Sequence, residues 1–197
     1  MNGLESFLLR NRLAEAGFAP SVFHYPSTQS QLAQVAEQLA IGLRAFGSGP
    51  VHLVGHSLGG LVILETLECH GPLPEGRVVL LGSPVRGSRA ARAVAGWSLG
   101  PQLLGRLAAT ELVRTQERSW SGPRELGVIA GSRSYGMGRM FADLPAPNDG
   151  TVAVDETRIS GASDSAILDV SHTGMLLSAA VAESLVKFLR SGSFGVR

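Results

Sequence analysis

Short apolar runs alternate with helical patterns along most of this chain, and that alternation constrains its fold more than any other feature. Runs typical of buried strands lie at 19–25, 51–54, 77–81, 126–130 and 165–170. Patterns with apolar residues three and four apart, typical of helices, lie at 3–16, 27–46, 58–69, 89–118 and 174–190. Strands separated by helices predict a mostly parallel sheet between layers of helices, an α/β architecture. No linker or internal repeat interrupts the alternation, so we expect a single domain over residues 1–197.

The composition narrows the class of protein. Hydrophobic residues make up 44% of the chain and charged residues 17%, which favours a well-buried core over disorder. The 17 basic and 16 acidic residues nearly cancel, so nucleic acid is not an expected partner. No apolar run reaches the roughly 20 residues of a transmembrane helix. No basic segment followed by an apolar stretch opens the chain, and we therefore expect a cytoplasmic protein.

Cofactor and metal motifs are missing from the sequence. The one lysine, Lys187, precedes Phe188, which excludes the Gly-Lys-Ser/Thr of a phosphate-binding loop. Cys69 is the one cysteine, which excludes internal disulfides and CxxC sites. HExxH and GxGxxG motifs do not occur either. We expect no cofactor and no metal, and chemistry carried by ordinary side chains.

A Gly-x-Ser-x-Gly motif occurs twice, as GHSLG at 55–59 and as GWSLG at 96–100. With 25 glycines in the chain, the motif alone decides nothing. A nucleophilic serine on a sharp turn needs a strand before it, a helix after it and small neighbours. Ser57 follows the apolar run 51–54 and precedes a helical pattern, whereas Ser98 lies inside one. We therefore predict Ser57 as the nucleophile.

Serine needs a base to take its proton, and in this architecture the acid and then the histidine follow it along the chain. Two histidines follow Ser57. His70 ends the helix that begins beside the serine, about a dozen residues away from it, whereas His172 directly follows the last predicted strand. We predict His172 as the general base. The remaining histidines, His24, His52 and His56, are expected to be structural. His56 is expected to pack beneath the serine turn.

Asp149 is the predicted acid. It lies in the turn sequence PNDGT at 147–151, after the fourth predicted strand and before His172. An aspartate in such a turn often bonds only its own backbone, but its place in the chain favours a catalytic role. Asp143 and Asp155 are the reserve candidates, and Asp169 is too close to the histidine in sequence.

Four segments resemble the α/β-hydrolases, and among them the bacterial serine lipases and esterases. VHLVGHSLGG at 51–60 is similar to their serine turn, and LGSPVRGS at 81–88 to the turn after their next strand. PNDGTV at 147–152 and SHTGM at 171–175 resemble their acid and histidine loops. The resemblance implies an α/β-hydrolase fold, a small-molecule ester or lipid substrate, and a Ser-His-Asp triad working through an acyl-enzyme without a cofactor. It also implies that the backbone N–H of Leu58 stabilises the oxyanion.

The start of the chain departs from that family. Lipases of this type open with an apolar strand and a His-Gly loop that supplies a second oxyanion donor, and nothing similar precedes residues 1–3. The missing strand would lie between the predicted strands 19–25 and 51–54. We hypothesise a truncated start, and expect these two strands either to close on each other or to leave a gap.

Residues 85–124 carry an apolar and arginine-rich segment between two strands. Its leucines are 99, 103, 104, 107 and 112, and its arginines are 86, 89, 92, 106, 114 and 118. One interpretation is a helical cap whose leucines meet an acyl chain. The other is an ordinary amphipathic helix pair with solvated arginines.

Other functions are compatible with the same residues. A thioester, amide or carbon–carbon bond hydrolase would use the same triad, and a non-catalytic binding protein would keep the sheet and use the pocket alone. The sequence does not fix the oligomeric state.

Overall fold

Four parallel strands form the centre of the molecule. The computed structural model describes residues 6–26, 31–47, 49–97, 105–115, 117–135 and 143–195. The strands are β1 (Leu53–His56), β2 (Val78–Leu81), β3 (Leu126–Gly131) and β4 (Asp164–Leu168), and they pair in chain order, β1-β2-β3-β4. The predicted parallel α/β architecture is therefore confirmed.

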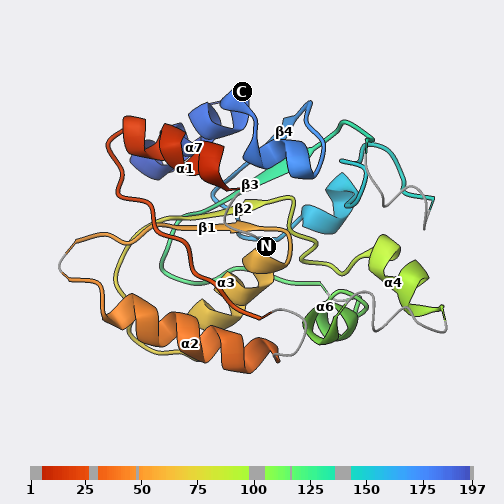
Figure 1. Ribbon diagram of the computed structural model, residues 1–197, viewed down its shortest axis with the longest axis horizontal. Helices are drawn as coiled ribbons and strands as arrows, with labels where there is room; N and C mark the ends of the chain where they lie inside the picture. The colour runs from red at the N-terminus through yellow and green to blue at the C-terminus, as the bar shows by residue number, and fades with distance from the viewer. Residues whose placement is uncertain are drawn as a thin grey trace.

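Helices cover both faces of the sheet, as Figure 1 shows. Side chains of β2 alternate between the two faces, since successive residues of a strand point to opposite sides. Val78 and Leu80 join the core under α2 (Leu32–Arg44) and α3 (Leu58–Cys69). Val79 and Leu81 join the core under α1 (Phe7–Glu15) and α7 (Ala179–Ser191). All four β2 residues are buried, as expected for a strand covered on both sides.

Shorter helices gather beyond the carboxyl ends of the strands, at the right of Figure 1. They include α4 (Arg89–Ala95), α6 (Arg106–Glu111) and the 3₁₀ helix η2 (Val154–Thr157). A second 3₁₀ helix, η3 (Thr173–Leu176), precedes α7. The loops that join strands to these helices place their side chains at this end of the sheet.

The strand expected at 19–25 is wrong, because residues 18–26 form no strand. Pro20 and Pro26 lack the N–H that a ladder needs. Among the described residues β1 pairs with β2 alone, so β1 is an edge strand and the segment 18–26 does not pair with it. The two expected strands neither close on each other nor enclose a third.

Several boundaries also differ from the expected ones. Helix α2 begins at Leu32 with Gln31 before it and ends at Arg44, within the expected range 27–46, of which residues 27–30 lie outside the described part of the chain. The pattern at 174–190 is divided into η3 and α7, because the Ser178 hydroxyl accepts a hydrogen bond from the Val181 N–H and starts a new helix.

The chain after α7 returns to the sheet. Phe194 is buried and its ring lies against that of Phe188, with centroids 4.7 Å apart. Both rings cover Gly127 of β3, where a Cβ atom would lie 2.7 Å from each. Asp164 at the start of β4 accepts a hydrogen bond from the Phe194 N–H at 2.7 Å. This tail therefore packs onto β3 and β4 together.

No helix in the described ranges combines the length and the apolar character needed to cross a membrane.

Candidate active site

Ser57 occupies a strained turn between β1 and α3. Its backbone angles are φ 53° and ψ −124°, and it is the one residue other than glycine with positive φ in the described part of the chain. Such a conformation costs of order 1–3 kcal/mol and persists where the surrounding structure enforces it. The Ser57 N–H donates to the Leu81 carbonyl of β2 at 2.9 Å, which anchors the turn to the sheet.

Glycines allow this turn to pack closely. A Cβ atom on Gly55 would lie 2.6 Å from the Gly60 nitrogen, and one on Gly60 would collide with the Ser83 hydroxyl. A Cβ atom on Gly59 would meet nothing within 4 Å. The expected need for small residues therefore holds at Gly55 and Gly60, but not at Gly59, the second glycine of the Gly-x-Ser-x-Gly motif.

Asp149 and His172 form a buried pair at the same end of the sheet. His172 Nδ1 lies 2.7 Å from Asp149 Oδ2, and Asp149 is 1% exposed. The other carboxylate oxygen, Oδ1, accepts hydrogen bonds from the N–H groups of Thr151 and Val152. Asp149 thus bonds its own turn with one oxygen and the histidine with the other.

The backbone of His172 is held as firmly as its ring. Its N–H donates to the Asp149 carbonyl at 2.9 Å. Its own carbonyl lies 3.0 Å from Nε2 of His56, the residue before Ser57, and the two imidazole rings have centroids 4.6 Å apart. The structure thus brings Asp149 and His172 together and sets His172 against His56, the last residue of β1, which directly precedes Ser57.

The Ser57 hydroxyl makes no hydrogen bond to His172 among the described residues. In unliganded hydrolases this contact is commonly long and tightens when substrate binds. With Nδ1 turned toward Asp149, the nitrogen left for a serine proton is His172 Nε2. Leu58 is the first residue of α3, so its N–H is among those that a helix leaves without an intrahelical partner.

Two further glycines make room for the pair, and the sequence analysis missed them. A Cβ atom on Gly82, directly after β2, would lie 3.1 Å from Asp149 Oδ2. One on Gly131, at the end of β3, would lie 2.7 Å from Asp149 Cβ and 2.8 Å from the methyl group of Met175. A glycine at the end of each of two neighbouring strands was the available signal.

The other aspartates considered for the acid lie apart from His172, and Asp155 and Asp169 each pair with an arginine. Asp155 forms a two-pronged ion pair with Arg89, at 3.0 and 2.9 Å, and that guanidinium lowers the pKa of the Asp155 carboxyl. Asp169 pairs with Arg133 on the surface, and Asp143 is exposed. Neither Asp155 nor Asp169 is bonded to His172.

The other histidines and the second serine motif stand apart from the pair. His70 caps the far end of α3, His24 is exposed, and His52 accepts a hydrogen bond from the Arg77 N–H. Burial and the nearby Arg77 and Arg124 lower the His52 pKa. Ser98 lies outside the described residues.

Helix α4 is fastened to the loop that carries Asp149. Glu156 of η2 is 3% exposed, and its carboxylate accepts hydrogen bonds from the N–H groups of Arg89 at 2.6 Å and Ala153 at 2.8 Å. Burial raises the pKa of Glu156. Two other arginines of this segment also have partners at the surface: Arg86 lies 4.0 Å from Glu117, and Arg92 donates to the Thr115 hydroxyl.

The leucines of the same segment have different surroundings. Leu107 is 1% exposed and belongs to the core under α2 and α3, so it does not meet an acyl chain as the cap interpretation expected. Leu112 packs against the same core. Leu99, Leu103 and Leu104 lie outside the described residues.

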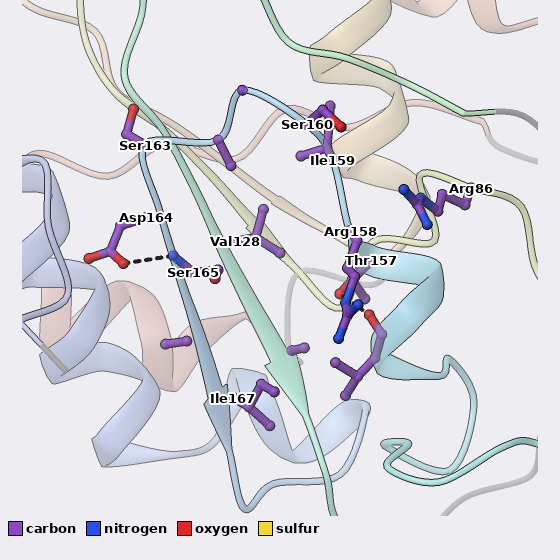
Figure 2. A pocket seen from close by; sticks show the side chains of 15 residues that line it. Arg86, Val128, Thr157, Arg158, Ile159, Ser160, Ser163, Asp164, Ser165 and Ile167 are labelled. Carbon is purple, nitrogen blue, oxygen red and sulfur yellow. Dashed lines mark hydrogen bonds between the residues drawn. The ribbon is translucent and has the colours of Figure 1, made fainter. Parts of the chain in front are cut away.

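A cavity of about 660 Å³ opens over β3 and β4, away from the site (Figure 2). Val128 and Ile167 form part of its floor, and Arg86 and Arg158 stand at one side. Ser57, Asp149 and His172 do not line it. It is a separate feature of the surface.

A parallel sheet covered by helices, with a sharp strand-to-helix turn at a serine, is consistent with the α/β-hydrolase fold. Residues 8–187 match the Alpha/beta hydrolase family, and the chain belongs to that family.

Solved structures agree with this assignment. The mature lipase BlEst2 of Bacillus licheniformis is similar, with a TM-score of 0.62 and 19% identity over 87% of this chain and 77% of that one. An esterase of Exiguobacterium antarcticum is similar with a TM-score of 0.61 and 17% identity, over 96% of this chain and 88% of the esterase. YbtT, a type II thioesterase from the yersiniabactin biosynthetic pathway, is similar with a TM-score of 0.53 and 20% identity, over 82% of this chain and 75% of YbtT. At such identities the likeness shows a shared fold. No curated protein sequence matches the chain.

Proposed function

We propose that this hydrolase cleaves carboxylic esters through a Ser57–His172–Asp149 triad. The observation that carries the proposal is the buried Asp149–His172 hydrogen bond, held against β1, the strand that directly precedes the strained Ser57. The names of the similar structures, a lipase and an esterase, support the same class of substrate.

The hydrogen bond between Asp149 and His172 supports the following proposed chemistry. His172 Nδ1–H donates to Asp149, so Nε2 takes the proton of the Ser57 hydroxyl as the oxygen attacks the ester carbonyl. The N–H of Leu58 stabilises the negative charge on the carbonyl oxygen. His172 then returns the proton to the leaving alcohol, and water hydrolyses the acyl-enzyme by the same steps in reverse.

We also propose that residues 85–124 form a cap beside this site, within one domain that spans residues 1–197. The attachment of α4 to η2 through Glu156 and Arg89 supports a fixed base for such a cap close to the acid loop. The buried Leu107 takes no part in substrate contact on this proposal.

Labelling with a fluorophosphonate tests the nucleophile. The adduct should form on Ser57, disappear in Ser57→Ala, and persist in Ser98→Ala, the matched change in the second Gly-x-Ser-x-Gly motif. Asp149→Asn should lower kcat by about 10³- to 10⁴-fold, since the imidazole then loses its orientation. An adduct on Ser98, or no adduct on a folded protein, would contradict the triad; the second result would favour a binding protein without catalysis.

Thioester hydrolysis is the second candidate, because the thioesterase YbtT shares the fold. Matched p-nitrophenyl and acyl-thioester substrates of equal chain length separate the two activities. We expect the higher kcat/KM for the oxygen ester; a clear preference for the thioester would replace the first proposal by the second.

A further inference from the structure

His56 lies directly before Ser57 in β1, and the triad leaves its side chain without a role. Its ring is nonetheless placed in contact with the histidine of the site. Nε2 lies 3.0 Å from the His172 carbonyl oxygen, and the two rings are tilted by 43° with centroids 4.6 Å apart.

The hydrogen bond fixes the tautomer of His56. A carbonyl oxygen can only accept, so the proton must be on Nε2. Nδ1 then carries a lone pair, and in the described structure it is shielded from solvent and has no hydrogen-bond partner. A second proton on Nδ1 would have nothing to bond, so the neutral ring is the form that fits.

Burial favours the same neutral form. The titratable groups that face His56 are His172, whose charge would lower the His56 pKa, and Asp149, whose carboxylate raises it. Burial is the largest cause, and the His56 pKa falls to about 4. A neutral His56 leaves His172 free to take up a proton without a second positive charge against its ring.

Three hydrogen bonds hold His172, and they come from two different parts of the fold. Asp149 supplies two of them, to the His172 N–H and to Nδ1, and both belong to the loop between β3 and β4. The bond from His56 comes from the last residue of β1, directly before Ser57. Of these three hydrogen bonds, the one from His56 is the one that connects His172 to β1, directly beside Ser57.

We propose that His56 is a positioning residue, which sets the distance between His172 and Ser57 by donating Nε2–H to the His172 carbonyl and packing against its ring. The inference rests on the proposed roles of Ser57 and His172. His56 touches no reacting atom and acts through His172.

Glutamine and methionine at position 56 provide a matched pair. The amide nitrogen of Gln stands the same number of bonds from the backbone as Nε2 and can donate, whereas the Met methyl group fills similar space and cannot. His56→Met should lower kcat and the labelling rate of Ser57 by roughly 10- to 100-fold with KM nearly unchanged, since small displacements of a base are costly. His56→Gln should stay within about threefold of the unaltered protein. Thermal melting would check that both variants fold.

A proton NMR measurement supplies a readout that does not need activity. The Nδ1–H of His172, bonded to Asp149, gives a downfield resonance that is assigned by its loss in Asp149→Asn. The signal should keep its position in His56→Gln and shift or broaden in His56→Met. Equal rates and equal spectra for the Met variant and the unaltered protein would overturn the positioning role, as would a Gln variant as slow as Met. If the unaltered protein fails to label while the NMR pattern holds, the hydrolase proposal falls and the positioning of His172 stands.

Discussion

Individual glycines around Ser57 differ in what their missing side chains allow. Gly60 packs against Ser83 and Gly55 against the backbone of Gly60, whereas Gly59 faces open space. Sequence motifs treat Gly59 as part of the signature and Gly60 as an accessory, so the steric requirement and the motif do not coincide.

Alanine substitutions measure that difference. Gly60→Ala should lower the free energy of unfolding by about 1–3 kcal/mol, because the new methyl group forces Ser83 or the helix to move. Gly59→Ala should leave it unchanged or raise it by up to about 1 kcal/mol, since alanine favours the helix. Urea unfolding of the two variants checks this, and equal stabilities would show that α3 shifts freely away from Ser83.

His56 makes the stability depend on pH. In the unfolded chain its imidazole binds a proton below a pKa near 6.5, and in the folded chain below about 4. Between these values the unfolded state holds more protons, so stability falls as the pH drops from 7 to 4, by roughly 3 kcal/mol at most. The lowered pKa of Asp155 acts in the same direction.

Comparison with His56→Gln isolates this contribution, because glutamine does not titrate. The unfolding free energy of the unaltered protein should decline more steeply over this range than that of the variant. Parallel pH profiles would mean that His56 is protonated as readily in the folded protein as in the unfolded one.

At the scale of elements, η2 and α4 depend on one buried carboxylate. Glu156→Ala removes the acceptor of two N–H groups, from Arg89 and Ala153, and leaves them buried without partners. We expect a loss of about 2–4 kcal/mol in the free energy of unfolding. Glu117→Ala, which removes an exposed carboxylate 4.0 Å from Arg86, should cost under about 1 kcal/mol. Chemical denaturation of both variants checks the contrast, and similar losses would show that Glu156 is not the main fastening.

The elements also show which parts of the fold the sequence predicts. Periodicity located α3 and the strands β1 to β4 within about two residues, because buried apolar runs and amphipathic stripes are local properties. It failed at 19–25, since a strand must also lie beside a partner strand, and where a segment lies depends on distant parts of the chain.

The candidate site divides in the same way. Chain order was enough to select Asp149 and His172 for one end of the sheet, where the structure brings them together. It could not show that His56 touches His172, nor that Gly82 and Gly131 leave space for Asp149 and Met175. Those contacts join residues that are far apart in sequence, and no local pattern encodes them.

At the scale of the whole molecule, the chain after α7 packs onto β3 and β4 through Phe194. Phe194→Ala should lower the free energy of unfolding by about 3–5 kcal/mol, because it leaves a cavity between Phe188 and β3. Phe46→Ala, at a 48% exposed ring, should change it by less than about 0.5 kcal/mol. Thermal and urea unfolding give both values; a small loss at Phe194 would mean that neighbouring side chains collapse into the space.

The spatial order of the strands repeats their order in the chain, and this has a consequence for synthesis. Each strand pairs with the next one to be made, so the sheet can grow from β1 without waiting for distant segments. Asp149 precedes β4 and His172 follows it, so their hydrogen bond forms only once the last strand has been added. Fluorophosphonate labelling of stalled nascent chains of increasing length would follow this sequence of events. We expect chains stalled before residue 172 to contain Ser57 without labelling it, and longer chains with the Asp149–His172 pair to be labelled at Ser57.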